Sequence, residues 1–174
     1  MDDPAPFLVE MHEWIWNGLK ADLKDVTAEE AEWRPLPHAN NISLILRHLR
    51  IEAGWHVASL DRGAPMADEV SPEEQRQIDS VSPDFQENLN ELEGQYARFV
   101  ALLRQVNLGT LQQRTEVAYK AIAGGRPIPS WFLGFHQATH LAMHWGQVRT
   151  LRNLYLKTQG KPARFHPQNP TYPQ

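Results

Sequence analysis

The segment from Ser130 to Leu156 reads SWFLGFHQATHLAMHWGQVRTLRNLYL and carries His136, His140 and His144 at intervals of four residues. Residues four apart are neighbours on one side of an α-helix, so the spacing predicts a helix with a row of imidazoles. We expect this row to face the interior, on the same face as Leu133, Met143, Gln147, Leu151 and Leu154. Buried imidazoles need polar partners, and a metal ion is a partner that several of them can share.

Outward from this segment, the helical spacing of apolar residues predicts three more long helices. The four expected helices span residues 5–24, 41–62, 83–106 and 130–157, and the proline-rich tail at 160–174 is expected to be extended. Together these elements predict an all-α protein, a four-helix bundle with long connections that forms one domain over residues 1–174.

Local signals mark where a short helical turn and the second long helix begin. Thr27 and Glu30 have the spacing of a capping box, and Asn40 or Asn41 is expected to cap the second long helix. The connection over residues 107–129 is long for a compact domain, which makes it a candidate lid or pocket wall.

Composition excludes several classes of protein. The 174 residues carry a formal net charge of -4 and no basic run, which argues against a dedicated nucleic-acid binder. No apolar stretch approaches the roughly 20 residues that cross a bilayer, and the acidic N-terminus lacks the features of a signal peptide, so we expect a cytoplasmic protein without membrane contact. The absence of cysteine excludes disulfides, thiolate ligands and a cysteine nucleophile.

A second row of polar residues, His48, Glu52 and His56, follows the second long helix at four-residue intervals. Neutral imidazole suits zinc, nickel, iron or copper, and three such ligands leave a coordination position for water or substrate. Gln137 stands where a zincin carries its glutamate, and the Glu-x-x-His motif of carboxylate di-iron bundles is absent. A hydrogen-bonded histidine cluster without metal is the alternative interpretation of the histidine row.

Two motifs resemble those of the DinB/YfiT-like metal-binding four-helix bundles. Residues 41–49, NISLILRHL, are similar to the second-helix motif of that family. Residues 140–147, HLAMHWGQ, are similar to its fourth-helix motif, in which two histidines four apart are followed by Gly-Gln. Trp33-Arg34-Pro35 also resembles the family sequence before the second helix, so the resemblance covers most of the chain, from about residue 27 to 155.

The resemblance implies that His48, His140 and His144 bind one divalent metal ion, with His136 one turn outside this set. Glu52 is then a base or a hydrogen-bond acceptor for a ligand imidazole, and a partner for a nearby arginine is the alternative role. Three imidazoles do not choose between zinc, nickel and iron.

Relatives in that family include metal-dependent transferases that use low-molecular-weight thiols such as bacillithiol or mycothiol, thiol-dependent isomerases, and proteins classed as metal-dependent hydrolases. The resemblance therefore implies an enzyme that activates a thiol co-substrate or water against a small electrophilic substrate. The alternative is a non-catalytic stress- or damage-response module in which the histidine site is structural. The resemblance also implies a homodimer.

Overall fold

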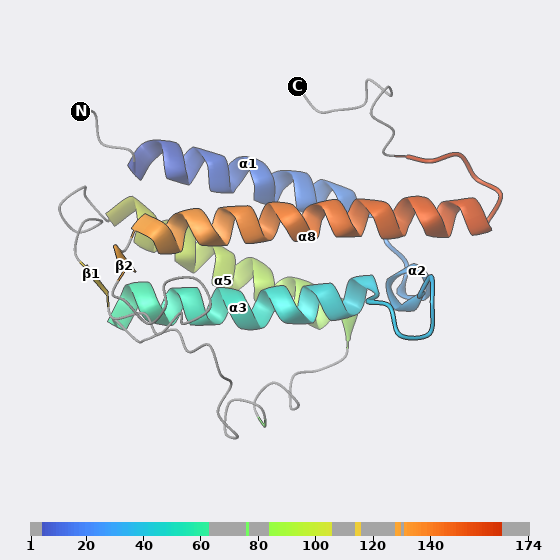
Figure 1. Cartoon of the computed structure of the whole chain (residues 1–174), viewed down its shortest axis with the longest axis horizontal. Helices are drawn as coiled ribbons and strands as arrows, with labels where there is room; N and C mark the ends of the chain where they lie inside the picture. The colour runs from blue at the N-terminus through green and yellow to red at the C-terminus, as the bar shows by residue number, and fades with distance from the viewer. Residues whose placement is uncertain are drawn as a thin grey trace.

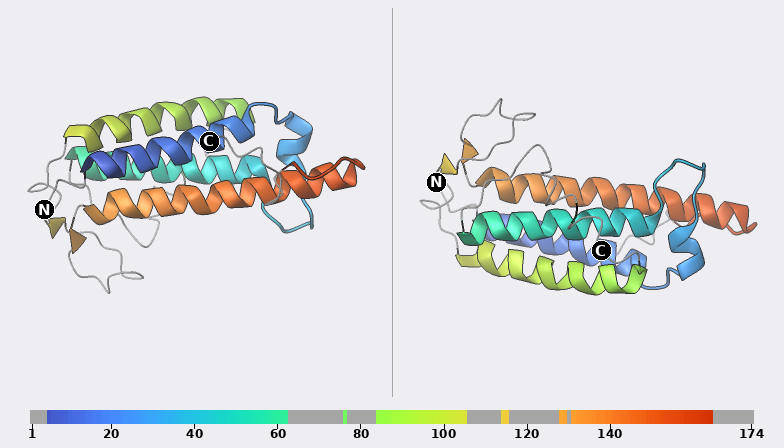
Figure 2. Two further views of the ribbon diagram at one scale, coloured as in Figure 1. Left: turned by 90° about the horizontal axis from the view of Figure 1, so that it is seen from above. Right: turned by 90° about the horizontal axis from the view of Figure 1, so that it is seen from below.

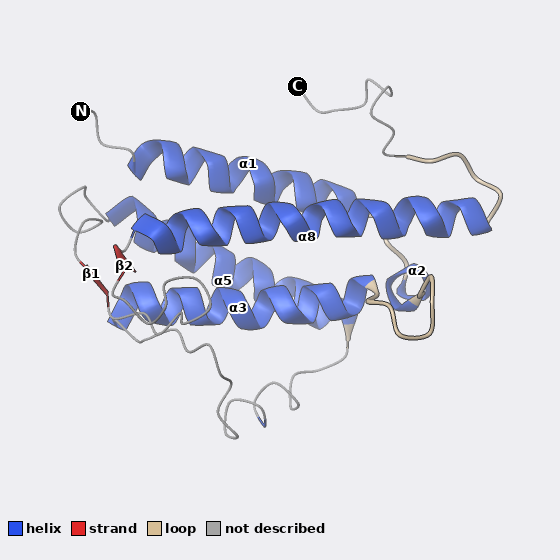
Figure 3. Ribbon diagram, in the orientation of Figure 1, coloured by secondary structure: helices blue, strands red, loops and turns tan. Residues whose placement is uncertain are grey.

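The structure is a computed structural model that describes residues 5–62, 76, 84–105, 114–115, 128–129 and 131–164. Its long helices are α1 (Ala5–Leu23), α3 (Ile42–Arg62), α5 (Phe85–Gln105) and α8 (Trp131–Thr158), with a short helix α2 (Ala28–Glu32) before α3. Two short strands, β1 (Arg114–Thr115) and β2 (Ile128–Pro129), pair antiparallel. The prediction of an all-α four-helix bundle is confirmed (Figure 3). The largest difference from the expected helix limits is at α5, which begins at Phe85 rather than at residue 83.

The two histidine-bearing helices, α3 and α8, are neighbours in the bundle. α1 packs against α8 and α5, and α3 packs against the same two helices, which gives the order α1, α8, α3, α5 around the bundle. α1 and α8 run in one direction and α3 and α5 in the other (Figures 1 and 2). The ion pairs Lys20–Glu93 and Glu13–Arg104 join the antiparallel helices α1 and α5. α3 and α8 are therefore also antiparallel.

One apolar core lies between the four long helices. It is formed by buried side chains from each of them, including Leu19, Leu46, Phe99 and Leu141. Burial of each side chain of this size stabilises the fold by about 1.5–3 kcal/mol. Within the described parts of the chain, no helix is both long enough and apolar enough to cross a membrane.

The caps expected at the start of α2 and α3 are present. The Thr27 hydroxyl accepts a hydrogen bond from the backbone N–H of Glu30 (3.1 Å), and Oδ1 of Asn41 accepts one from the N–H of Leu44 (2.8 Å). The carboxylate of Glu30 accepts a hydrogen bond from Arg152 on α8 (2.6 Å). α2 is thereby attached to α8 as well as to the start of α3.

The prediction for the inward face of α8 is partly wrong. Met143 and Leu154 are 52% and 40% exposed and Gln147 is also exposed, whereas Leu151 is buried as expected. The side chain of Leu133 lies outside the described residues. The buried apolar residues of α8 are Ala138, Leu141, Trp145, Val148 and Leu151. The histidine row therefore runs along the border of the buried face rather than through its centre.

Two sequence expectations fall mainly outside the described residues. The connection over 107–129, considered above as a lid, is described only at β1 and β2. The expected extended tail is described as far as residue 164, and its described part is not helical. α8 is followed by Gly160, whose φ of 67° is the left-handed conformation that commonly follows a helix C-terminus.

Candidate metal centre

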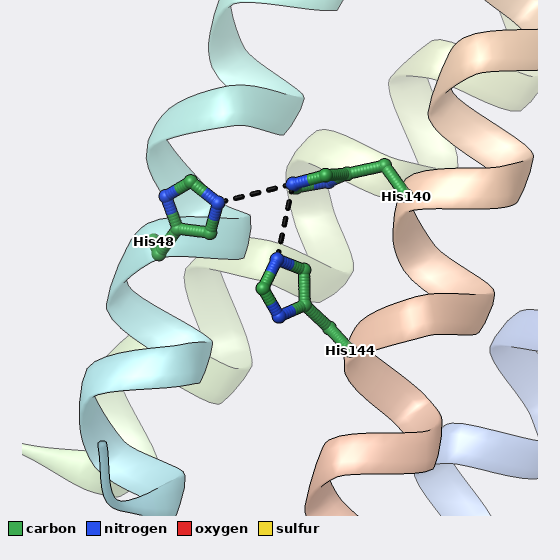
Figure 4. Close-up of side chains that lie close together, drawn as sticks. All are labelled: His48, His140 and His144. Atoms are coloured by element: carbon green, nitrogen blue, oxygen red, sulfur yellow. Dashed lines mark hydrogen bonds between the residues drawn. The ribbon is translucent and has the colours of Figure 1, made fainter. Parts of the chain in front are cut away.

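His48 on α3 faces His140 and His144 on α8 (Figure 4). Nε2 of His140 is 3.0 Å from Nε2 of His48 and 3.0 Å from Nε2 of His144. The His144 side chain is buried, whereas the side chain of His48 is 46% exposed, so the group is accessible to solvent on the His48 side. The structure brings together the three residues that the sequence motifs implied as ligands, and we call His48, His140 and His144 the triad.

The hydrogen bonds of this group leave one contact that neutral imidazoles cannot satisfy. Nδ1 of His144 lies 2.8 Å from Oε1 of Gln147, so it carries the proton and leaves Nε2 with its lone pair. Nε2 of His140 can then donate to His144, but it has no second proton or lone pair for His48. A cation between the three nitrogens would satisfy all of them.

The spacing and charge state of the three rings fit metal ligands. Two nitrogens that bind one ion at about 2.1 Å are about 3.4 Å apart at a tetrahedral angle and about 3.0 Å apart at the right angle of octahedral coordination, and the two Nε2–Nε2 distances match the second value. Burial, and then the neighbouring imidazoles, lower the pKa of His140 to about 3. Burial also lowers the pKa of His48 and of His144. At neutral pH the rings are therefore in the uncharged form that binds metals.

Glu52, one turn after His48, lies behind this group. Its Oε2 is 3.5 Å from Nδ1 of His140, and its Oε1 is 3.9 Å from Nε2 of His48. Within the described part of the chain, Glu52 Oε2 and His140 Nδ1 are both buried without a hydrogen-bond partner. Burial raises the pKa of Glu52 to about 7. A small approach of the two atoms would let the imidazole donate to the carboxylate, as outer carboxylates do for metal-binding histidines.

A second group was not anticipated from the sequence, although its members were noted there. His136 does lie one turn outside the triad, and it meets His56, with Nε2 of His56 3.3 Å from Nδ1 of His136. The ligand atoms of Glu52, His56 and His136 all lie within 4.8 Å of one another. His56 lies two turns after His48 on α3, and His136 lies two turns before His144 on α8. Because the two helices are antiparallel, these steps lead in the same direction and bring His56 and His136 together. The four-residue spacing on both helices was the available signal.

Comparisons with known proteins agree with the fold. The family model of the DinB superfamily matches residues 11–148, a range that contains the five histidines of the two groups and Glu52. A crystal structure of a conserved protein from Enterococcus faecalis is similar, with a TM-score of 0.68 and 17% sequence identity, over 90% of this chain and 99% of that chain. At this level of identity the likeness concerns the fold alone. No curated protein matches the sequence.

Proposed function

This chain belongs to the DinB superfamily, and from that membership and its convergent histidines we propose that it is a divalent-metal-dependent enzyme. Its proposed reaction is the attack of a low-molecular-weight thiol, or of water, on a small electrophilic substrate. The observation that carries the proposal is that Nε2 of His140 lies 3.0 Å from Nε2 of His48 and 3.0 Å from Nε2 of His144. The three nitrogens lie on a side of the bundle that is open to solvent.

The three imidazoles are the proposed ligands of the ion. When bound, the ion supplies Lewis acidity, which lowers the pKa of a thiol or water molecule in an open coordination position. Gln147 holds the His144 ring in the tautomer that presents Nε2. Zinc, nickel and iron all suit this donor set.

Glu52 has two proposed roles, which its position allows together. Through Oε2 it would accept a hydrogen bond from Nδ1 of His140 and so orient that ligand. Through Oε1, near Nε2 of His48, it would take the proton that the thiol or water loses. The pKa of about 7 that burial gives this carboxyl suits proton transfer near neutral pH, and a nearby cation favours its ionised form.

The proposal is tested by a screen of thiols with epoxide and halide electrophiles, on untagged protein loaded with zinc, nickel or iron(II). We expect metal-dependent turnover that His140→Ala abolishes and that Glu52→Gln lowers about 100-fold, as for loss of a general base. His38→Ala, which changes an exposed histidine outside both groups, is the control and keeps wild-type turnover. Turnover without any thiol would identify water as the nucleophile.

The non-catalytic alternative gives a different set of results. In that case no thiol or azide changes the absorption spectrum of the cobalt-substituted protein, no substrate is consumed, and His140→Ala lowers only the melting temperature. That combination would overturn the proposal, as would failure of the metal-free protein to bind any divalent ion.

A further inference from the structure

We propose that the chain holds a second divalent-metal site, formed by Glu52, His56 and His136, directly beside the histidine triad. This site is additional to the metal centre of the proposed function. Its donor set is two imidazoles and one carboxylate, whereas the triad offers three imidazoles.

The distances within this group fit ligands of a single ion. Nε2 of His56 and Nδ1 of His136 are 3.3 Å apart. Two nitrogens that bind one ion at about 2.1 Å with a tetrahedral angle are about 3.4 Å apart. A carboxylate oxygen of Glu52 lies within 4.8 Å of a ring nitrogen of each histidine, so a movement of this side chain would complete a three-ligand set.

His56 is already held in the state that a ligand needs. Its side chain is fully buried, and its Nδ1 donates a hydrogen bond to the backbone carbonyl of Glu52 (2.8 Å). The proton is therefore on Nδ1, and Nε2 presents its lone pair towards His136. Donation from the second ring nitrogen to a backbone carbonyl is the usual support of metal-binding histidines.

Glu52 lies between the two groups and connects them. Its Oε2 is 3.5 Å from Nδ1 of His140, and the same carboxylate completes the set with His56 and His136. Its negative charge partly offsets the repulsion between two bound cations. Its role as proton acceptor in the proposed function applies to the form in which the second site is empty, because a bound cation makes the carboxylate a weaker base. Because a carboxylate replaces one imidazole, the second site should favour iron(II) or manganese more than the triad does.

The same distances also fit a proton shared between two neutral rings, with Nδ1–H of His136 donating to Nε2 of His56. The two arrangements differ in one measurable quantity, which is the number of metal ions bound per chain. A metal titration therefore separates them without any knowledge of the substrate.

The experiment titrates untagged, metal-stripped protein with Co²⁺ and follows the bound metal by visible absorption and elemental analysis. We expect two Co²⁺ per chain in the wild type and one in His136→Ala. The control His38→Ala, which changes an exposed histidine, should keep two. His140→Ala should retain one Co²⁺ whose absorption spectrum differs from that of the ion left in His136→Ala, because the remaining donors differ.

One Co²⁺ in the wild type, unchanged in His136→Ala but lost in His140→Ala, would overturn the second site and leave the proposed function intact. Loss of metal in His136→Ala alone, with His140→Ala unaffected, would support the second site and refute the triad. Circular dichroism checks that each variant is folded, and if His136→Ala is not, His136→Gln replaces it with the same expected count.

Discussion

At the scale of single residues, His12 shows how a buried histidine of this protein is satisfied without an ion. Its Nδ1 accepts a hydrogen bond from the Tyr96 hydroxyl (2.7 Å), and its Nε2 donates to the carbonyl of Gly134 (2.8 Å). Both ring nitrogens therefore have a suitable partner. His140 differs, because its Nε2 serves two imidazoles at once and its Nδ1 lacks a hydrogen bond within the described residues. This contrast between the buried His12 and the largely buried His140 is what favours a cation at the triad.

His12 also predicts a pH dependence of stability. Burial lowers the pKa of His12 to about 4, whereas an unfolded chain protonates this imidazole near pH 6.5. Its stabilising contribution is therefore complete above about pH 6.5 and is lost as the pH falls towards 4. The difference between the folded and unfolded pKa values corresponds to about 3 kcal/mol in the free energy of unfolding.

The measurement is urea denaturation of metal-free protein at pH 7 and pH 4.5. We expect His12→Gln to be less stable than the wild type at pH 7 but to lose less stability on acidification. The exposed-site variant His38→Ala should follow the wild type. If His12→Gln and the wild type lost the same stability between pH 7 and pH 4.5, the pH dependence would not come from His12.

At the scale of secondary-structure elements, the close contact between α1 and α8 depends on Gly18. A Cβ atom at this position would lie 2.2 Å from the Trp145 indole. That ring is held in place, since its N–H donates to the Asp22 carboxylate and the Arg149 guanidinium lies 4.2 Å from the ring centroid. Trp145 adjoins His144, so this contact also fixes the position of the two triad histidines on α8.

We expect Gly18→Ala to lower the free energy of unfolding by about 1–3 kcal/mol, because neither the indole nor the helix backbone can move freely. Gly94→Ala on α5 is the matched control, since a Cβ there meets nothing within 4 Å. It should raise the free energy of unfolding by up to about 1 kcal/mol through helix propensity. Chemical denaturation of both variants tests the pair, and equal effects would show that the contact is not tight.

At the scale of the whole molecule, two adjacent helices expose large apolar side chains. Phe7 and Trp14 on α1 are 68% and 64% exposed, and Phe135 and Met143 on α8 are 48% and 52% exposed. The members of each pair are seven or eight residues apart and so share a side of their helix. Apolar rows of this kind commonly mark an interface. We therefore propose that the expected homodimer forms through the α1–α8 face.

Light scattering coupled to size-exclusion chromatography tests this assignment. The wild type should have twice the 20.0 kDa mass of the chain, and Met143→Glu should have the mass of one chain. Leu36→Glu is the control, because Leu36 is more exposed than Met143, at 69% against 52%, but lies in the loop between α2 and α3. A wild-type mass of 20.0 kDa would refute the dimer, and a dimeric Met143→Glu would place the interface on another face.

Features that depend on residues close together in the chain could be predicted without the structure. Helix limits follow, to within one or two residues, from the 3.6-residue period, and the cap at Thr27 follows from a side chain that bonds the backbone three residues ahead. The sequence left the second cap open between Asn40 and Asn41, and the structure shows that it is Asn41. The residues themselves indicated His48 as the best-placed third ring from another helix, and the motif resemblance then implied its grouping with His140 and His144. Periodicity alone could not relate two helices some ninety residues apart.

The buried face of α8, and the residues of other helices that it contacts, became clear from the packed bundle. Apolar side chains surround α8, with Met143 exposed and Trp145 buried two residues later, so periodicity did not mark a single inward face. The partnership of His56 with His136 required the antiparallel register of α3 and α8. Register between helices is set by the packing of all four helices together, as in the Gly18–Trp145 contact, and no local stretch of sequence contains that information.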